Sequence, residues 1–230
     1  MPIGYLDAII MGLIRYRITG NDWDYFKEIH FFFESFYFYA DETNQFIDKE
    51  ISSAKNSVEK FSKEIEVDPT WEHEWFDYFA NVQTKVGLTD IYYDSLIMTL
   101  YSFVEKKMFF LSNHLALGQA IKVNDIAGKG IFKYQKYLSK VCGIDFSQID
   151  NEWTNLLGFN NLRNQIVHSE GKRSIPKSNQ NLTHFLKSIN GVVLTEEGDA
   201  VNYHFATDDI LKMFAATART IIDHIYLEKV

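Results

Sequence analysis

The sequence has little cysteine and proline and no long apolar stretch. Of its 230 residues, three are proline and one is cysteine, Cys142. A single cysteine excludes an internal disulfide framework and any zinc site with several cysteines, and it fits a reducing compartment. No uncharged run is long enough to span a membrane, and the amino-terminal residues lack the basic start of a secretion signal. We therefore expect a soluble, cytoplasmic protein.

Recognisable metal motifs are also missing. There is no HExxH sequence and no cysteine cluster, and Glu72-His73-Glu74 has ligand types only at alternating spacing. We therefore expect neither a metal ion nor another cofactor.

Apolar residues are plentiful, and the charge is unevenly distributed. Hydrophobic residues make up 46% of the chain and aromatic residues 16%, which is ample for a packed core. The net charge of -8 argues mildly against general binding of nucleic acid. Residues 120–180, however, contain nine basic and five acidic residues, a local charge of +4. One region is basic within an acidic chain.

Apolar positions recur mostly at helical spacing. This periodicity predicts a mainly all-α fold, an antiparallel helical bundle with a small β-hairpin before the C-terminal helix. Pro69 separates two long helical segments, and Gly87 is expected to end the second of them. The expected helices cover residues 1–16, 21–66, 70–86, 90–117, 129–141, 150–171, 181–189 and 208–228, the expected loop covers 174–180, and the hairpin strands cover 192–194 and 201–205.

The two ends of the chain differ in character. Residues 1–88 form an acidic helical region that we expect to pack on the bundle. Residues 89–230 would form the bundle itself and contain every motif considered below.

The segment 163–168 has residue types suited to RNA cleavage. Arg163 provides a permanently charged, forked donor for phosphate oxygens, and His168 can move a proton near neutral pH. In RNA the 2′-hydroxyl attacks the adjacent phosphate, so these two groups suffice without a metal. Five positions correspond to about 140° around an ideal helix. Joint action therefore requires a loosened last turn or a second copy of the helix, which favours a homodimer.

Arg163-Asn164-Gln165-Ile166-Val167-His168 resembles the R-N-x-x-x-H signature of the HEPN superfamily, helical bundles that include many RNases of toxin-antitoxin, phage-defence and CRISPR systems. The likeness covers residues 89–229. It implies that Arg163 and His168 are catalytic, that Asn164 orients the site, and that two protomers build the cleft. It also implies an RNA substrate and an antitoxin or regulatory partner. Some members have a tyrosine two residues after the histidine, where this chain has Glu170.

Basic residues near the motif are candidates for contacts with RNA. Lys172 and Arg173 follow the motif directly, whereas Lys133 and Lys136 belong to a lysine stripe along the helix 129–141. The alternative interpretation of the stripe is a solvated helix face.

Structural interpretations of the motif stay open. His168 would suit the negative end of a helix dipole, and Arg163 would suit pairing with a carboxylate, for which Glu105 is one candidate. A second Arg-x4-His segment, Arg219 to His224, lacks the following asparagine, and we interpret it as ordinary amphipathic helix. The main hypothesis is thus a metal-independent endoribonuclease, a toxin or phage-defence effector. The alternative is a non-catalytic module that binds a nucleotide, RNA or a protein.

Overall fold

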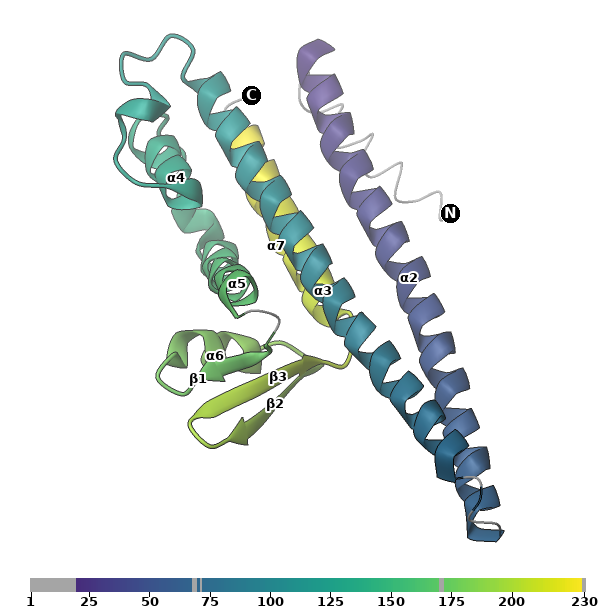
Figure 1. The fold of residues 1–230 in the computed structure, drawn as a ribbon. Helices are drawn as coiled ribbons and strands as arrows, with labels where there is room; N and C mark the ends of the chain where they lie inside the picture. The colour runs from purple at the N-terminus through teal and green to yellow at the C-terminus, as the bar shows by residue number, and fades with distance from the viewer. Residues whose placement is uncertain (1–19, 68–69, 71, 170–171, 229–230) are drawn as a thin grey trace.

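The structure, a computed structural model, describes residues 20–67, 70, 72–169 and 172–228. The helix expected over residues 1–16 lies outside these ranges. The described residues form a mainly all-α fold with six α-helices and a three-stranded antiparallel sheet that precedes the C-terminal helix (Figure 1). The fold class predicted from the sequence is confirmed.

The elements agree closely with the periodicity of the sequence, apart from one helix break and one short strand. In chain order they are α2 (Gly20–Val67), α3 (Glu72–Leu115), η2 (Val123–Asp125), α4 (Gly130–Lys140), η3 (Phe146–Ile149), α5 (Asp150–His168), β1 (Ser174–Pro176), α6 (Gln180–Lys187), β2 (Val192–Glu197), β3 (Ala200–Phe205) and α7 (Asp209–Leu227).

The two longest helices, α2 and α3, run side by side as an antiparallel hairpin, and its far end extends beyond the rest of the molecule (Figure 1). Helix α2 ends at Val67 and α3 begins at Glu72, whereas Pro69, where the sequence predicts the break, lies outside the described ranges. The extended part is held by side chains that join the helices. Lys85 and Glu50 form an ion pair of 2.7 Å, and the rings of Phe61 and Tyr78 stack at 4.4 Å.

The prediction that a helix ends at Gly87 is wrong, because α3 continues through this residue without interruption. A glycine costs about 1 kcal/mol in a helix interior, which neighbouring contacts can exceed. Before the glycine, Val82 is buried and Lys85 pairs with Glu50 of α2, and after it Tyr93 is buried. Residue 88, where the sequence suggests a boundary between two regions, therefore lies inside α3.

The core is centred on α3, which packs against α2, α4, α5 and α7. Its buried residues recur every three or four positions, as a helix surrounded by others requires. The opposite wall comes from α5 and α7, whose Phe159 and Phe214 rings stack at 4.0 Å. The buried apolar residues of α3 in this region are Tyr93, Leu96, Ile97, Leu100, Tyr101, Val104, Met108 and Leu111.

The small sheet has the strand order β1-β3-β2. The predicted hairpin is confirmed as β2 and β3, with Leu194 opposite Tyr203. Strand β1 lies in the segment expected as a loop, and it pairs with β3 through Ile175 opposite Val201. Ile175 is fully buried, so this short strand closes the apolar face of the sheet.

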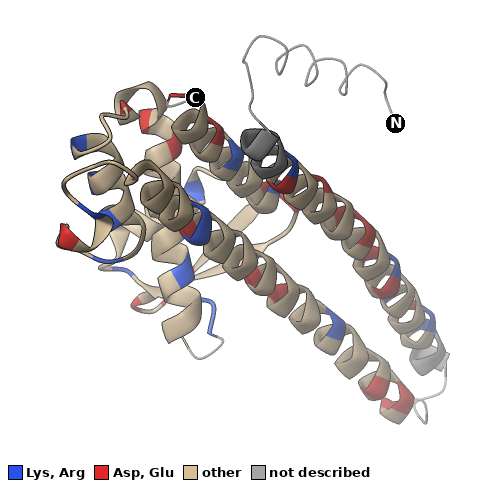
Figure 2. Cartoon of the chain, turned by 90° about the horizontal axis from the view of Figure 1, so that it is seen from above, with Lys and Arg blue, Asp and Glu red and all other residues tan. Residues whose placement is uncertain are grey.

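Acidic residues recur along both long helices (Figure 2). No helix in the described ranges combines the length and the apolar character that crossing a bilayer requires. Among the same residues, no three histidine, cysteine or acidic side chains lie close enough together to hold a metal ion.

Two glycines in helices provide a matched test of this packing. A Cβ added to Gly158 in α5 would overlap the ring of Phe185 from α6, whereas one added to Gly87 in α3 would meet nothing within 4 Å. We expect Gly158→Ala to lower the free energy of unfolding by roughly 1–3 kcal/mol through overpacking. Gly87→Ala should raise it by about 0.5–1 kcal/mol through helix propensity. Urea unfolding measures both, and equal effects of the same sign would contradict the packing described.

Candidate functional site

The motif segment forms the last turns of α5. The approach to this helix is fixed at η3, where the side chain of Asp145 accepts a hydrogen bond of 3.0 Å from the backbone N–H of Ser147. The helix ends at His168, and the N–H of Ser169 still donates to the carbonyl of Gln165. The last turn is therefore regular helix rather than the loosened turn that the motif spacing allowed.

Arg163 faces α3. Its guanidinium carbon lies 5.7 Å from the centroid of the Tyr101 ring, and its Nη1 donates a hydrogen bond of 3.0 Å to Oδ1 of Asn164. The Nε of Arg163 is buried and has no hydrogen-bond partner within the described ranges. The guanidinium is thus oriented by two neighbours while one of its donors stays unused.

The ring beneath Arg163 is itself fixed in position. The hydroxyl of Tyr101 donates a hydrogen bond of 2.6 Å to Oδ1 of Asn160, one turn before Arg163 on α5. Burial, with a smaller contribution from Glu105, raises the pKa of the Tyr101 hydroxyl to about 12 against the opposing effect of Arg163. Tyr101 is therefore a neutral donor at physiological pH. We refer to Tyr101, Asn160, Arg163 and Asn164 as the α3–α5 polar cluster.

Glu105, the carboxylate that sequence reasoning offered as a partner for Arg163, lies against the start of α4. A Cβ on Gly130 would stand 2.8 Å from its Oε1. No ion pair joins Glu105 to Arg163 in the part of the chain that the structure describes. Lys107, two residues after Glu105 on the same helix, pairs with Glu28 of α2 at 2.7 Å.

His168 is exposed at the end of α5 and makes no hydrogen bond or ion pair with any residue that the structure describes. Because the helix is regular between Arg163 and His168, their side chains leave its axis about 140° apart. One chain therefore joins Arg163 to Asn164 but does not bring His168 to them. Val167, which precedes the histidine, is also exposed, so the end of α5 presents both an imidazole and an apolar side chain to solvent.

The four basic residues suggested for RNA contact differ in surroundings. Lys172 and Lys136 are exposed, and Lys133 is half-buried on α4. Arg173, by contrast, makes ion pairs with two carboxylates of α3, at 3.0 Å to Asp90 and 2.6 Å to Asp94.

Arg173 also lies over aromatic rings of β3. Its guanidinium carbon is 4.4 Å from the Phe205 ring centroid and 5.5 Å from that of Tyr203. Only 10% of its side chain is exposed, and its charge is balanced within the chain. Burial raises the pKa of Asp94 to about 6 against the opposing charge of Arg173, and Asp90 adds to the rise. We call Arg173, Asp90, Asp94 and the rings of Tyr203 and Phe205 the Arg173 clamp, because these contacts hold the segment after α5 against α3.

The second Arg-x4-His segment has only structural contacts. Arg219 pairs with Asp223 one turn away at 3.7 Å, and Nε2 of His224 lies 2.8 Å from the carbonyl oxygen of Asp145. These contacts fit the interpretation of this segment as ordinary amphipathic helix.

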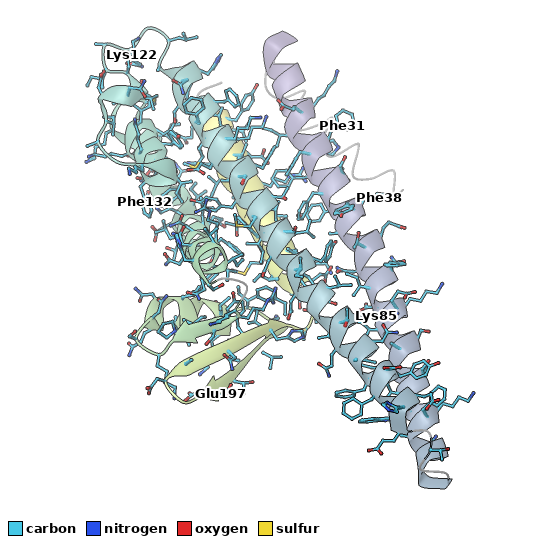
Figure 3. The ribbon with its side chains drawn as sticks, in the orientation of Figure 1. Phe31, Phe38, Lys85, Lys122, Phe132 and Glu197 are labelled. Atoms are coloured by element: carbon cyan, nitrogen blue, oxygen red, sulfur yellow. The ribbon has the colours of Figure 1, made fainter. Side chains whose placement is uncertain are left out.

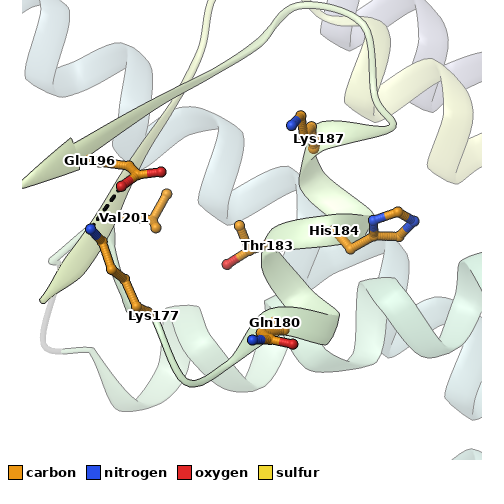
Figure 4. A pocket seen from close by; sticks show the side chains of 7 residues that line it. All are labelled: Lys177, Gln180, Thr183, His184, Lys187, Glu196 and Val201. Atoms are coloured by element: carbon orange, nitrogen blue, oxygen red, sulfur yellow. Dashed lines mark ion pairs between the residues drawn. The ribbon is translucent and has the colours of Figure 1, made fainter.

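A hollow of about 440 Å³ lies between α6 and the sheet (Figure 4). Lys177 and Glu196 form an ion pair of 2.7 Å on one side, and the ring of His184 points away from Val201. None of the motif residues lines this hollow, whose walls are formed by Lys177, Gln180, Thr183, His184, Lys187, Glu196 and Val201.

Comparison with protein-family models, with curated proteins and with solved structures finds no match to this chain. The motif and its surroundings are therefore the basis of the functional argument.

Sequence reasoning located Arg163, Asn164 and His168 but missed Tyr101 and Asn160. Asn160 precedes Arg163 by three positions on one helix, so helical spacing could have suggested it. Tyr101 is 59 residues from Asn160, and only the packing of α5 on α3 brings them together.

Arg173 and Lys177 provide a matched test of a buried and an exposed ion pair. Arg173→Met would leave two partly buried carboxylates without their counter-charge, and we expect the free energy of unfolding to fall by roughly 3 kcal/mol. Lys177→Ala removes a pair whose side chains are 45% and 74% exposed, so it should change stability little. Urea unfolding of both variants checks this, and a stable Arg173→Met protein would contradict the role of the Arg173 clamp.

Proposed function

We propose that this chain is a HEPN-like endoribonuclease that cleaves RNA by 2′-hydroxyl attack, without a metal ion, at a site built from two copies. One observation carries the proposal. The last six positions of α5 begin with Arg163, which is hydrogen-bonded to Asn164, and end with the exposed His168.

The roles follow from the chemistry of the groups. Arg163 holds the non-bridging phosphate oxygens and stabilises the charge that develops on them. Its stacking on Tyr101 and its bond to Asn164 orient the guanidinium before RNA binds. His168 transfers the protons of the 2′-hydroxyl and the leaving 5′-oxygen.

Helix geometry supports the proposal of a second copy. Arg163 and His168 leave α5 in different directions, so one phosphodiester can meet both only if the histidine comes from another protomer. A two-fold axis beside the end of α5 would produce two equivalent Arg163/His168 sites. The exposed Val167 supplies apolar surface for such a contact.

Lysines around the motif would hold the RNA backbone. Lys172 lies just beyond α5, and Lys133 and Lys136 lie on α4, which packs beside α3. Arg173 is less suited to this task because Asp90 and Asp94 already balance its charge.

We place this activity in the cytoplasm, in a toxin or phage-defence effector that an antitoxin or regulatory protein restrains. The motif and the helical bundle are the support for this assignment, since both are typical of HEPN effectors.

A second candidate function is a non-catalytic, HEPN-like module that binds a nucleotide, RNA or a protein. The observation that favours it is the contact of Arg163 with Tyr101 and Asn164, which would serve a purely structural purpose equally well.

Cleavage in the presence of EDTA separates these two functions. We expect the purified protein to convert RNA into fragments ending in 2′,3′-cyclic phosphate. His168→Ala should lower the rate at least ~100-fold, because proton transfer in the transition state contributes about that much. Arg163→Lys, which keeps the charge but loses the fork, should also lower the rate. His114→Ala, at an exposed histidine of α3, serves as the control and should cleave normally. Intact RNA, or equal cleavage by His168→Ala, would reject the enzymatic proposal.

Mixing two inactive variants tests whether the site is shared. If Arg163 and His168 act from different protomers, a mixed dimer of Arg163→Ala and His168→Ala contains one complete site. After free subunit exchange, activity should recover to about one quarter of the wild-type value. Recovery is measured as the initial rate of RNA cleavage against total protein. No recovery from a mixture that demonstrably forms mixed dimers would show that each site uses a single chain.

A further inference from the structure

Helix α2 has apolar side chains on two sides. Its inner row packs into the core and consists of buried residues such as Ile29, Phe33 and Phe36. On the other side of the same helix, large aromatic side chains face solvent. Their exposed fractions are 63% for Phe31, 69% for Phe38, 56% for Tyr39 and 64% for Phe46.

Exposed apolar area of this kind marks an interaction surface. Figure 3 labels Phe31 and Phe38 on α2, across α3 from Phe132 of α4. With the exposed polar residues between and beside them, these aromatics form one continuous row. We call it the outer α2 stripe: Glu28, Phe31, Ser35, Phe38, Tyr39, Glu42, Phe46 and Lys49.

The spacing of the outer α2 stripe is the same in both directions. From Glu28 the steps are 3, 4, 3, 1, 3, 4 and 3 residues, so the order reads identically from Lys49 backwards. Steps of three and four are those of residues that share a helix face and pack between helices. The midpoint lies between Phe38 and Tyr39.

We propose that a second copy of this chain covers the outer α2 stripe, with the two α2 helices antiparallel about a two-fold axis between Phe38 and Tyr39. In a two-fold interface, residue i contacts residue j and j contacts i. Phe31 of each copy then faces Phe46 of the other, and Phe38 faces Tyr39. Ser35 likewise faces Glu42.

The charges at the ends of the stripe fit this arrangement. Glu28 of one copy lies beside Lys49 of the other, an attractive pair that occurs twice. A parallel pair would place Glu28, Glu42 and Lys49 each beside its own equivalent, with repulsion at all three positions. Glu28 already pairs with Lys107, but 65% of its side chain remains exposed and able to meet a second cation.

Other occupants fit less well. Acidic residues of the same helix, including Glu34, Asp41 and Asp48, disfavour a polyanion such as RNA. The eight aromatic side chains of two copies supply on the order of 1,000 Å² of apolar surface, close to the lower bound for a specific interface.

This inference does not rest on the proposed function. Helix α2 packs on α3 and α7, and Figure 1 shows it on the other side of α3 from α4 and α5. The interface at the outer α2 stripe is therefore different from the one proposed beside the end of α5.

Light scattering coupled to size-exclusion chromatography of the full chain tests the stripe. Replacing Phe38 and Phe46 together with serine should raise the dissociation constant of the α2 dimer at least roughly 100-fold, because two central aromatic anchors are lost. Phe132→Ser removes a comparably exposed aromatic, 52% on α4, and should leave this dimer intact. Unchanged assembly of the Phe38→Ser/Phe46→Ser protein would overturn the proposal, and RNA cleavage by the same variants reports separately on the α5 site.

Disulfide mapping tests the direction of the helices even if those variants fold poorly. Ser35→Cys and Glu42→Cys proteins, oxidised separately, should form no intermolecular disulfide at these positions, because equivalent residues lie about 10 Å apart along the axis. An equal mixture should form disulfide-linked pairs. The wild-type protein, whose buried Cys142 is its single cysteine, is the background control. Cross-linking of Ser35→Cys with itself, or none in the mixture, would overturn the antiparallel interface.

Discussion

The packing of other elements around α3 is the constraint on which the rest of this structure depends. Each turn of this helix, from Tyr93 onwards, places side chains against α2 on one side and against α4, α5 or α7 on the others. Burial of one such side chain stabilises the fold by roughly 1.5–3 kcal/mol. The polar features described above also use α3 as their base, because Tyr101 and the two carboxylates of the Arg173 clamp all project from it.

The two arginines that flank the end of α5 show how surroundings decide the function of one residue type. Arg173 is enclosed by two carboxylates and two aromatic rings, and its task is to join chain segments. Arg163 contacts one aromatic ring and one amide and makes no ion pair with any residue in the described ranges, so it keeps the capacity to bind an anion. Both arginines carry the same charge, and they lie ten positions apart in the sequence. Only the position of acidic residues on α3 separates a structural arginine from a candidate catalytic one.

Much of the fold could be predicted from the sequence because helical periodicity is a local signal. The helical segments, the separation of α2 from α3 and the hairpin of β2 and β3 all follow from residues within a few turns of one another. Gly87 misled the prediction because its cost to a helix is local, whereas the contacts that exceed this cost come from α2. Strand β1 was missed because its three residues include Pro176 and become a strand only by pairing with β3.

The candidate site was predictable to the same extent. Arg163, Asn164 and His168 are neighbours in one helix, so their residue types and spacing could be read directly. The partners that orient or neutralise the arginines come from α3, between 62 and 83 residues away along the chain. No spacing rule reaches across such separations, and packing alone establishes them.

The continuity of α3 has a mechanical consequence. Sharp bends in helices arise at proline, at glycine/serine pairs or at local insertions; α3 contains no proline between Glu72 and Leu115 and continues through its single glycine, Gly87, as regular α-helix. The far end of the α2–α3 hairpin, at Trp75 of α3, and Tyr101 therefore lie on one continuous helix, about 40 Å apart along its axis. A force applied at this end, for example by a bound macromolecule, would therefore tilt α3 as a whole. The ring of Tyr101, which contacts Arg163, would move with it.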